Sequence, residues 1–419
     1  MRVSLLSARS HQGGAARAAV RLLRALRGHG VQATLHTPCI DGPESGVKAI
    51  GRWPTATHAR MRLALDQYPR WLRGHAGTDQ FTTGLGPAPV GLERAFDAAD
   101  LLHLHWIGKG TLPLRRLARL RLPVVWTLHD QWPITGGCHY DAGCGRFAYG
   151  CGSCPVLGST RAADLSARLF QMKRSAYRDI DLSFIAPSRW LADQVRAAPL
   201  GRDHPVHLIP NALDRSVFSP GADRAVARRA LGLPTTARVV AFSAMGGTQE
   251  PRKGFDLLQD ALRRLGAALP HADTHLLVIG GTVTAAADLP LPARGTGHIE
   301  DEPALARVLA AADLLVAPSR QDNLPNTVLE ALACGVPAVA FDIGGMPDLI
   351  EHQRSGYLAQ PFDAADLAAG IAWVLGDDDR HRALCLAARE STERYAPASI
   401  AARHVGLYEA LLTRPRPRR

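Results

Sequence analysis

Residues 314–345, LLVAPSRQDNLPNTVLEALACGVPAVAFDIGG, place two apolar runs on either side of a polar loop and a helical segment. The runs LLVAPS at 314 and AVAFDIGG at 338 are typical of strands covered on both faces, as in a parallel sheet. Between them we expect a helix from about Asn323 to Cys334. The stretch therefore predicts a strand, a crossover helix and a parallel strand.

The ends of this helix carry recognisable signals. Asp322 and Asn323 are good amino-terminal caps, and Pro325 suits the first turn. Gly335 suits the left-handed position after the last turn, and Pro337 prevents the helix from continuing.

The same alternation continues outward in both directions. Strand candidates begin at 3 (VSLLS), 31 (VQATLH), 101 (LLHLHW), 124 (VVWTLH), 182 (LSFIAPS) and 206 (VHLIPN), and a second series begins at 238 (RVVAFSAM) and 275 (HLLVIGG). Two doubly wound α/β units in tandem are predicted. We expect domains at 1–208 and 209–398, and a carboxy-terminal helix within 399–419 that returns to the first domain and ends in a basic tail.

Composition favours a soluble globular protein. The chain has 419 residues, of which 46% are hydrophobic and 21% are charged, which argues against disorder, collagen-like repeats and disulfide scaffolds. Its net charge of +11 favours an anionic partner: nucleic acid, a membrane surface or a phosphorylated small molecule. The amino terminus lacks the apolar length of a secretory signal, and no apolar run could span a bilayer, so we expect a cytoplasmic protein.

The segment 319–337 predicts chemistry as well as structure. A helix that follows a buried strand directs its free N–H groups and the positive end of its dipole toward the binding crevice, where a diphosphate would be stabilised. Asp322 and Glu330 offer two carboxylates to different hydroxyl-bearing parts of one extended ligand. The alternative is a capping aspartate and a solvated helical glutamate.

Several further motifs stand in a characteristic order along the chain. They are His11-Gln12-Gly13-Gly14-Ala15, Thr127-Leu128-His129-Asp130, Ala186-Pro187-Ser188, IPNALD at 209–214, Pro251-Arg252-Lys253-Gly254, the glycine pair at 280–281 and the acid-x7-Glu pattern from Asp322 to Glu330. Together they resemble the retaining glycosyltransferases of family 4, the group 1 glycosyltransferases. The resemblance implies the GT-B fold, in which two Rossmann-like domains face each other across a cleft.

The resemblance also implies roles for individual residues. Glu330 would accept hydrogen bonds from the ribose of a nucleotide, and Asp322 would contact the hydroxyls of the donor hexose. Lys253 would stabilise charge on the leaving diphosphate, and His129 would orient the sugar. The remaining implied donor-binding residues are Gly13, Gly14, Arg252, Asn323, Leu324, Pro325 and Asn326.

Two departures from the family pattern stand out. The first acid of the pattern is commonly Glu and is Asp322 here, which is one methylene shorter. The Arg that many relatives place about six residues before the Lys is replaced by the turn at 245–248. Arg252 is adjacent to Lys253, and adjacent residues at a helix start are expected to point in different directions.

The reaction implied is hexose transfer with retention of anomeric configuration, in which the leaving phosphate guides the acceptor oxygen and no metal cofactor is required. The donor would be a UDP- or GDP-sugar. The acceptor would be a saccharide, either free or lipid-linked, in the synthesis of exopolysaccharide.

A cysteine-rich insertion at 136–155 follows His129. Cys138, Cys144, Cys151 and Cys154 have the spacing C-x5-C-x6-C-x2-C, and four thiolates match the ligand count of a structural zinc site. His139 could replace one thiolate. Packing or redox-labile thiols and an iron–sulfur cluster are the alternatives. Similar loops occur in a branch of the family that builds bacterial exopolysaccharides, and a place beside the site suggests acceptor contact.

Residues 57–74 interleave basic and apolar side chains. Arg60, Arg62, Arg70 and Arg73 alternate with Leu63, Leu65, Tyr68, Trp71 and Leu72, and Arg115, Arg116, Arg119 and Arg121 follow in the same domain. This composition is typical of an interfacial helix drawn to anionic lipid, and the alternative is a solvated helical face. A peripheral position at the inner face of the plasma membrane would suit a lipid-linked acceptor.

Two other functional classes remain as alternatives. A zinc-containing nucleic-acid-binding protein would use the charge and the cysteines, but it leaves the repeated strand–helix pattern unexplained and lacks clusters of stacking aromatics, so we expect no nucleic-acid partner. A GT-B phosphorylase or sugar epimerase would keep the fold and change the reaction.

Overall fold

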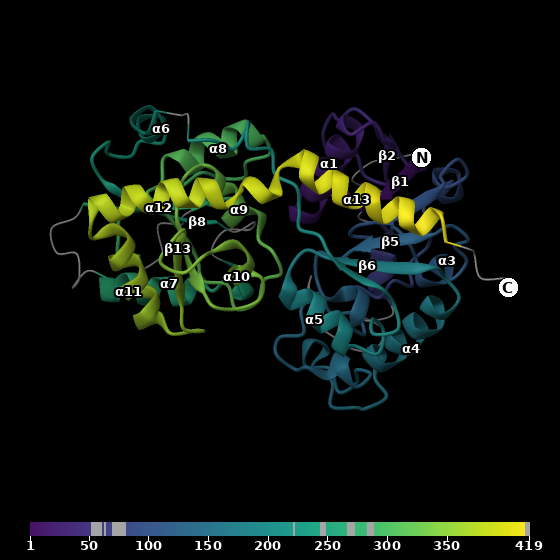
Figure 1. Cartoon of the computed structure of the whole chain (residues 1–419). Helices are drawn as coiled ribbons and strands as arrows, with labels where there is room; N and C mark the ends of the chain where they lie inside the picture. The colour runs from purple at the N-terminus through teal and green to yellow at the C-terminus, as the bar shows by residue number, and fades with distance from the viewer. Residues whose placement is uncertain are drawn as a thin grey trace. The chain divides into compact units, whose positions relative to one another are not determined.

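The computed structural model describes residues 1–51, 61–62, 64–68, 81–220, 223–243, 249–265, 273–282 and 289–414. The chain divides into two compact units (Figure 1). The first unit combines Met1–Ala212 with Pro397–Arg419, and the second is Leu213–Ala396.

The described strands of the first unit form one parallel sheet of seven, in the order β3-β2-β1-β4-β5-β6-β7. The strands are β1 (Arg2–Leu6), β2 (Gln32–Thr37), β3 (Val47–Ala49), β4 (Leu101–Leu104), β5 (Val124–Thr127), β6 (Leu182–Ala186) and β7 (Val206–Leu208). The central strands β4, β5 and β6 are buried along their whole length, as expected for strands covered on both faces.

Helices of the first unit connect these strands. They are α1 (Gly14–Gly28), α3 (Leu114–Leu117), α4 (Leu165–Arg178) and α5 (Arg189–Ala197), with the short 3-10 turns η1 (Leu92–Ala95), η2 (Trp132–Ile134), η3 (Arg146–Ala148) and η4 (Pro155–Leu157). Asp164 and Ser188 cap α4 and α5 by accepting hydrogen bonds from backbone amides of the first turn.

The described strands of the second unit form a parallel sheet of six, in the order β10-β9-β8-β11-β12-β13. The strands are β8 (Arg238–Ser243), β9 (Thr274–Ile279), β10 (Ala293–Gly295), β11 (Leu314–Ala317), β12 (Ala338–Phe341) and β13 (Gly356–Ala359). Their helices are α6 (Arg224–Ala230), α7 (Phe255–Leu265), α8 (Glu302–Ala310), α9 (Asn326–Ala333), α10 (Met346–Leu349), α11 (Ala364–Leu375) and α12 (Asp378–Ser391), with η6 (Pro251–Lys253) and η7 (Glu393–Tyr395).

The helices of the second unit cover both faces of its sheet. One apolar cluster packs α8 and α9 against β8, β11 and β12, and another packs α7 and α11 against β8, β9 and β12. The two doubly wound parallel α/β units predicted from the sequence are thereby confirmed.

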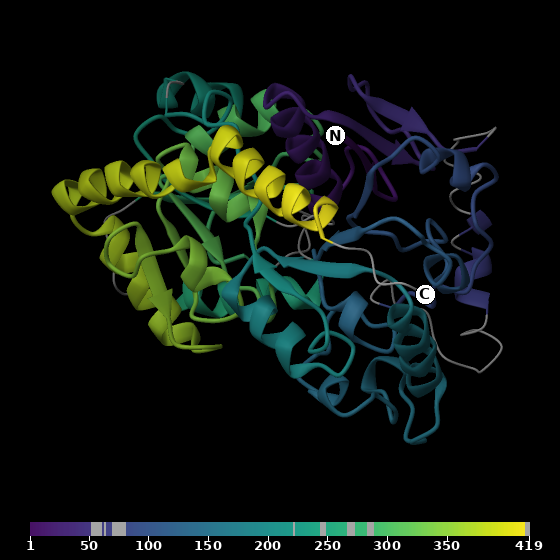
Figure 2. The same ribbon diagram turned by 45° about the vertical axis from the view of Figure 1, so that its right-hand side comes forward.

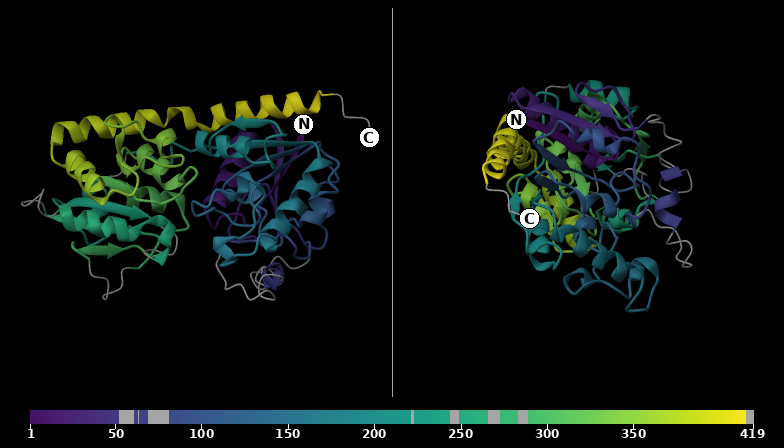
Figure 3. Two further views of the ribbon diagram at one scale, coloured as in Figure 1. Left: turned by 90° about the horizontal axis from the view of Figure 1, so that it is seen from below. Right: turned by 90° about the vertical axis from the view of Figure 1, so that its right-hand side faces the viewer.

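The last helix, α13 (Pro397–Leu412), belongs to the first unit and packs against α1. Figures 2 and 3 show it, in yellow, beside the purple amino-terminal helix. Ile400, Leu407, Tyr408 and Leu411 join the apolar cluster beneath α1. In the described part of the chain, no helix is both long enough and apolar enough to cross a bilayer.

One expected helix begins later than predicted. We expected α9 to start near Asn323, with Asp322 or Asn323 as its cap, but the helix begins at Asn326 and Pro325 occupies the capping position without a side-chain cap. The reason is that the Asp322 carboxylate binds side chains from elsewhere in the unit and does not turn back onto the helix amides.

Candidate functional site

Asp322 lies in the loop between β11 and α9 and meets two cations. Its Oδ2 atom lies 2.6 Å from Nζ of Lys253 and 3.4 Å from a guanidinium nitrogen of Arg252. Ser319 adds a longer hydrogen bond of 3.3 Å to the same oxygen. The expectation that Arg252 and Lys253 point in different directions is wrong, because both belong to the tight turn η6 and both reach this carboxylate.

The backbone explains how η6 comes so close to the loop after β11. Gly254 ends η6 with a φ of 67°, and a Cβ atom at this position would lie 2.0 Å from the carbonyl oxygen of Pro318. The amide of Arg320 donates to the carbonyl of Arg252 at 2.7 Å, and the Arg252 guanidinium donates to the carbonyl of Gln321 at 2.9 Å. Only glycine permits both the left-handed conformation and this contact.

Electrostatics keep the Asp322 carboxyl ionised. Burial alone would raise its pKa, but the charges of Lys253 and Arg252 and the hydrogen bonds from Lys253 and Ser319 lower the pKa below its usual value. Arg252 also pairs with Glu250 at 2.7 Å, which offsets part of its charge. Among the described residues, the ammonium of Lys253 pairs with Asp322 alone.

A glycine turn after β12 closes against the other side of the Asp322 backbone. Gly344 has a φ of 56°, and a Cβ there would lie 2.1 Å from the Asp322 carbonyl oxygen. The amide of Gly345 donates to that same oxygen at 3.2 Å. The position of Asp322 is therefore fixed from β11, η6 and the turn after β12.

The remaining predicted residues of the second unit lie on the same short stretch of chain. Asn323 and Leu324 are buried, and Pro325 and Asn326 are half-buried at the start of α9. Glu330 is 1% exposed on α9, about one turn from the helix start. A carboxylate this deeply buried needs polar or charged partners, as a ligand-binding carboxylate does.

In the first unit, the predicted glycine loop follows β1 and leads into α1. Gly13 has a φ of 99° and precedes Gly14, the first residue of α1. The loop is held by Asp41, whose carboxylate accepts the amides of Ser10, His11 and Gln12 at 2.7 to 3.2 Å. We did not predict Asp41, although an acidic residue just after β2 is placed to reach this loop at the neighbouring strand end.

His129 follows β5, and it lies beside His105, which follows the neighbouring strand β4. Their Nε2 and Nδ1 atoms are 3.0 Å apart, and the rings stack with centroids 5.3 Å apart. Burial lowers the pKa of His129 to about 4, although the charge of Asp130 acts in the opposite direction. The ring is therefore neutral near neutral pH. We did not predict a role for His105.

The cysteine-rich insertion packs on the same unit as an irregular loop. Cys138, Cys144, Cys151 and Cys154 are all unpaired thiols, and an amide hydrogen bond of 3.1 Å joins Gly136 to Sγ of Cys151. Burial raises the pKa of Cys151 to about 12. In the described residues, no three His, Cys, Asp or Glu side chains are arranged to hold a metal ion. The zinc site stays a prediction.

His139 does not serve as a spare ligand. Its Nδ1 atom lies 2.7 Å from the carboxylate of Asp130 and its Nε2 atom lies 2.8 Å from the hydroxyl of Thr82. Both ring nitrogens are therefore used, and the suggestion that His139 replaces a thiolate is wrong. The same Asp130 carboxylate accepts the indole N–H of Trp106 at 2.9 Å.

The basic segment at 57–74 falls largely outside the described residues, which include only 61–62 and 64–68 of it. Leu65 and Tyr68 are 46% and 53% exposed there. Arg62 donates to the Pro38 carbonyl at 3.3 Å, and Arg116 pairs with Glu93 at 2.8 Å. The turn at 245–248 also lies outside the described residues.

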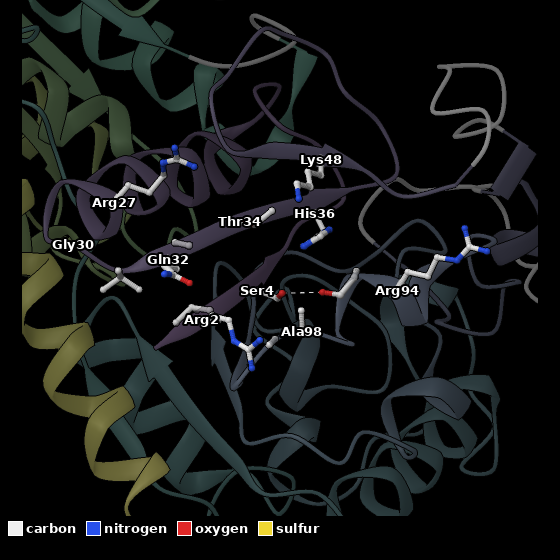
Figure 4. Close-up of a pocket in the computed structure, with 15 residues that line it drawn as sticks. Arg2, Ser4, Arg27, Gly30, Gln32, Thr34, His36, Lys48, Arg94 and Ala98 are labelled. Carbon is white, nitrogen blue, oxygen red and sulfur yellow. Dashed lines mark hydrogen bonds between the residues drawn. The ribbon is translucent and has the colours of Figure 1, made fainter.

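A separate cavity of about 540 Å³ opens on one face of β1 and β2 (Figure 4). Residues of both strands line it, and none of the predicted site residues does. The polar and charged residues of the lining are Arg2, Ser4, Arg27, Gln32, Thr34, His36, Lys48 and Arg94. The guanidinium of Arg2 is paired with Asp100 at 2.8 Å. The polar alternation along β2 is the sequence signal that could have revealed this face.

Comparison with known proteins places the chain among enzymes of sugar transfer. A family model described as "Glycosyltransferase Family 4" matches residues 12–217, and one described as "Glycosyl transferases group 1" matches residues 238–377. A D-inositol 3-phosphate glycosyltransferase of Thermobispora bispora is 29% identical over 75% of this chain and 71% of its own length. The corresponding protein of Jonesia denitrificans is 26% identical over 74% and 71%.

Solved structures show the same fold. A sucrose-phosphate synthase from Thermosynechococcus elongatus superimposes with a TM-score of 0.68 at 20% identity, covering 98% of this chain and 99% of that one. HepE of Anabaena, solved with UDP and glucose, gives 0.64 at 18% identity over 98% and 100%. WaaG, described as a glycosyltransferase of lipopolysaccharide biosynthesis, gives 0.63 at 16% identity over 97% and 99%.

Proposed function

This chain belongs to the group 1 glycosyltransferases, and on that premise we propose that it transfers a hexose from a nucleotide sugar to a saccharide hydroxyl with retention of anomeric configuration. The observation that carries the proposal is the convergence of Lys253 and Arg252 on Asp322 at the carboxyl end of β11. Carboxyl ends of parallel strands are where ligands of such sheets bind.

Asp322, Lys253 and Glu330 divide the work of holding a donor. The ionised Asp322 accepts hydrogen bonds from hexose hydroxyls. Lys253, which is paired with this carboxylate, faces the diphosphate. Glu330 binds the ribose from α9. The glycine loop that Asp41 holds would contribute amides at Gly13 and Gly14, and His129 would contact the sugar.

The chemical step needs no protein nucleophile. The bond from the anomeric carbon to the phosphate oxygen breaks, the acceptor oxygen bonds to the same face of that carbon, and its proton passes to the leaving phosphate. Lys253 stabilises the charge that collects on this phosphate, and Arg252 assists. Because these cations serve the leaving group, we propose that no divalent metal is required.

We propose UDP as the nucleotide of the donor, with GDP as the alternative. Support comes from HepE, which shares the fold and was solved with UDP, with UDP and glucose, and with UDP-glucose. The assignment needs its own test, because a shared fold at 18% identity does not carry ligand preference.

For the acceptor we propose a saccharide, in its lipid-linked form at the membrane surface, as in exopolysaccharide synthesis. A second candidate is a phosphorylated cyclitol, which is favoured by the names of the relatives that match the chain along three quarters of its length. The net charge of +11 is compatible with either acceptor, since both present anionic groups.

The test is a two-stage screen of the purified chain. Thermal shift with UDP-, GDP- and ADP-hexoses identifies the donor, because selective binding raises the unfolding temperature. The selected donor is then incubated with a lipid-linked saccharide, a free saccharide or inositol 3-phosphate, with and without EDTA. Transfer to one acceptor with an unchanged anomeric configuration supports the proposal. Phosphorolysis, or epimerisation without any acceptor, contradicts it.

A further inference from the structure

A row of aromatic side chains runs through the first unit, from His129 to the helix α13. The ring of His105 stacks on His129 on one side and on His103 on the other, with centroids 5.3 Å and 4.5 Å apart. His103 in turn contacts Tyr408 and His404 of α13, at centroid distances of 5.7 Å and 5.6 Å. In this row His129, which is half-buried at the end of β5, lies against His105, which is buried.

These rings are neutral around pH 7. Burial and the neighbouring imidazoles lower the pKa of His103 and His105 well below the usual value, and burial lowers that of His129 and His404 to about 4. A neutral imidazole has one N–H donor and one bare acceptor nitrogen. Each contact between two of these nitrogens therefore has a single donor, and the identity of the donor fixes both tautomers.

The contact between His105 and His129 has two arrangements. If His129 donates from Nε2, then His105 must carry its own proton on Nε2. That nitrogen is buried and has no hydrogen-bond partner among the described residues, so this arrangement leaves an orphaned N–H in the core. If His105 donates from Nδ1, its Nε2 is a bare lone pair, and orphaned buried N–H groups are much rarer than under-satisfied acceptors.

We infer that His105 is a positioning residue that holds His129 in the tautomer with its proton on Nδ1. In this state His129 accepts from His105 at Nε2 and presents an N–H donor at its other nitrogen. Nδ1 of His129 has no partner among the described residues, and it is not one of the nitrogens buried without a partner. A ligand at the end of β5 therefore meets a fixed hydrogen-bond donor.

This donor suits an oxygen of the ligand, either a hexose hydroxyl or a phosphate oxygen, and to that extent the inference rests on the proposed function. The tautomer itself is a property of the free protein. His103 stacks on the other side of His105 and is itself fixed in place. The hydroxyls of Tyr408 and Thr127 lie 2.6 Å and 2.7 Å from its two ring nitrogens. Hydroxyl groups both donate and accept, so they anchor His103 without dictating its tautomer.

The direct test is nitrogen-15 NMR of the full chain labelled at histidine, without donor or acceptor, near pH 7. Long-range correlations distinguish protonated from bare ring nitrogens, and the signal that is lost in His129→Gln assigns His129. We expect a bare Nε2 and a protonated Nδ1. A protonated Nε2 on His129 overturns the inference, whether or not any sugar transfer is ever detected.

Two variants of His105 separate positioning from packing. His105→Phe keeps a ring in the stack and removes the donor, so His129 should populate both tautomers. His105→Asn supplies an amide N–H near the position of Nδ1 and should restore the single tautomer. Tyr408→Phe removes the hydroxyl contact to His103 and should leave His129 unchanged. If His105→Phe leaves His129 entirely in the Nδ1-protonated tautomer, His105 does not position it.

Kinetics provide the second readout once a donor is known. We expect His105→Phe to lower kcat/KM for the donor by about three- to tenfold, the range for one neutral hydrogen bond, and His105→Asn to recover most of that loss. Affinity for the nucleoside diphosphate without its sugar should not change. A sugar-independent loss in both variants would show that the ring only packs, which contradicts the inference.

Discussion

Nζ of Lys253 lies 2.6 Å from Oδ2 of Asp322, and the two residues are 69 positions apart in the sequence. The pair joins the turn before α7 to the loop after β11. It holds the lysine in place before any ligand arrives. Under the proposed function, the carboxylate that faces the hexose also orients the cation that faces the diphosphate. Preorganised charge of this kind is the largest single contribution in many group-transfer enzymes.

The contact between Gly254 and Pro318 gives a prediction about this geometry. Gly254→Ala should destabilise the second unit by about 1 to 3 kcal/mol through strain, and it should also push η6 away from the loop and lower transfer activity. Gly297→Ala is the matched control, because Gly297 has the same φ of 67° and nothing within 4 Å of its Cβ position. Thermal unfolding and activity are measured for both. Equal losses of activity would show that the contact with Pro318 has no role.

Glu330→Gln should weaken binding of the free nucleoside diphosphate while the fold persists, because an amide is a poorer acceptor for ribose hydroxyls than a carboxylate. The expected loss is about 1 to 3 kcal/mol, measured by calorimetry. Glu393→Gln, at an exposed position of the same unit, is the control. Unchanged affinity in Glu330→Gln would remove Glu330 from the nucleotide site.

The cysteine-rich loop should hold one structural zinc ion. Elemental analysis of protein purified without added metal is compared with a quadruple variant in which Cys138, Cys144, Cys151 and Cys154 are replaced by Ser. We expect close to one zinc per chain in the parent, because a closed four-thiolate site retains its metal tightly. A parent that contains less than about 0.2 zinc per chain argues instead for packed or redox-active thiols.

The buried histidines make the first unit sensitive to mild acid. The folded pKa of His404 is about 4, below the value of about 6.5 for an unfolded chain, so the unfolded state takes up the proton first. Its contribution to stability is complete above pH 6.5 and is lost progressively toward pH 4. The slope is at most about 1.4 kcal/mol per pH unit for one histidine.

His404→Gln should therefore flatten the pH dependence of unfolding between pH 6.5 and 5, whereas the exposed His29→Gln should not. Tryptophan fluorescence is a suitable probe, since Trp373 is the only one of the 7 tryptophans in the sequence of the second unit. An identical slope in parent and His404→Gln would show that this ring does not titrate as its burial requires.

The sequence predicted the inner strands of both parallel sheets because they are mostly apolar runs of four to six residues between Gly, Pro and Asp. It did not predict the edge strands β3, β10 and β13. It predicted the region of Asp322 because the acid-x7-Glu pattern follows a buried strand. It misplaced the start of α9, because the capping preference of Asp322 is local whereas its actual partners, Lys253 and Arg252, are distant in the sequence.

The parts of the site that escaped prediction depend on contacts between strand ends. Asp41 reaches the loop after β1, and His105 reaches His129, only because β1 pairs with β2 and β4 pairs with β5. Each residue, taken alone, is an ordinary polar side chain at the end of a strand. The neighbour order of the strands, which no local pattern contains, gives them their partners.

The most direct test of the central claim compares Lys253→Ala with Arg252→Ala in steady-state transfer from the identified donor. Because charge accumulates on the phosphate as the glycosidic bond breaks, Lys253→Ala should lower kcat by roughly 100-fold, about 2.7 kcal/mol, with a smaller effect on the donor KM. Arg252→Ala should cost less than about tenfold, since Glu250 already offsets part of its charge. A greater loss in Arg252→Ala would contradict the account and make the guanidinium the cation of the leaving group.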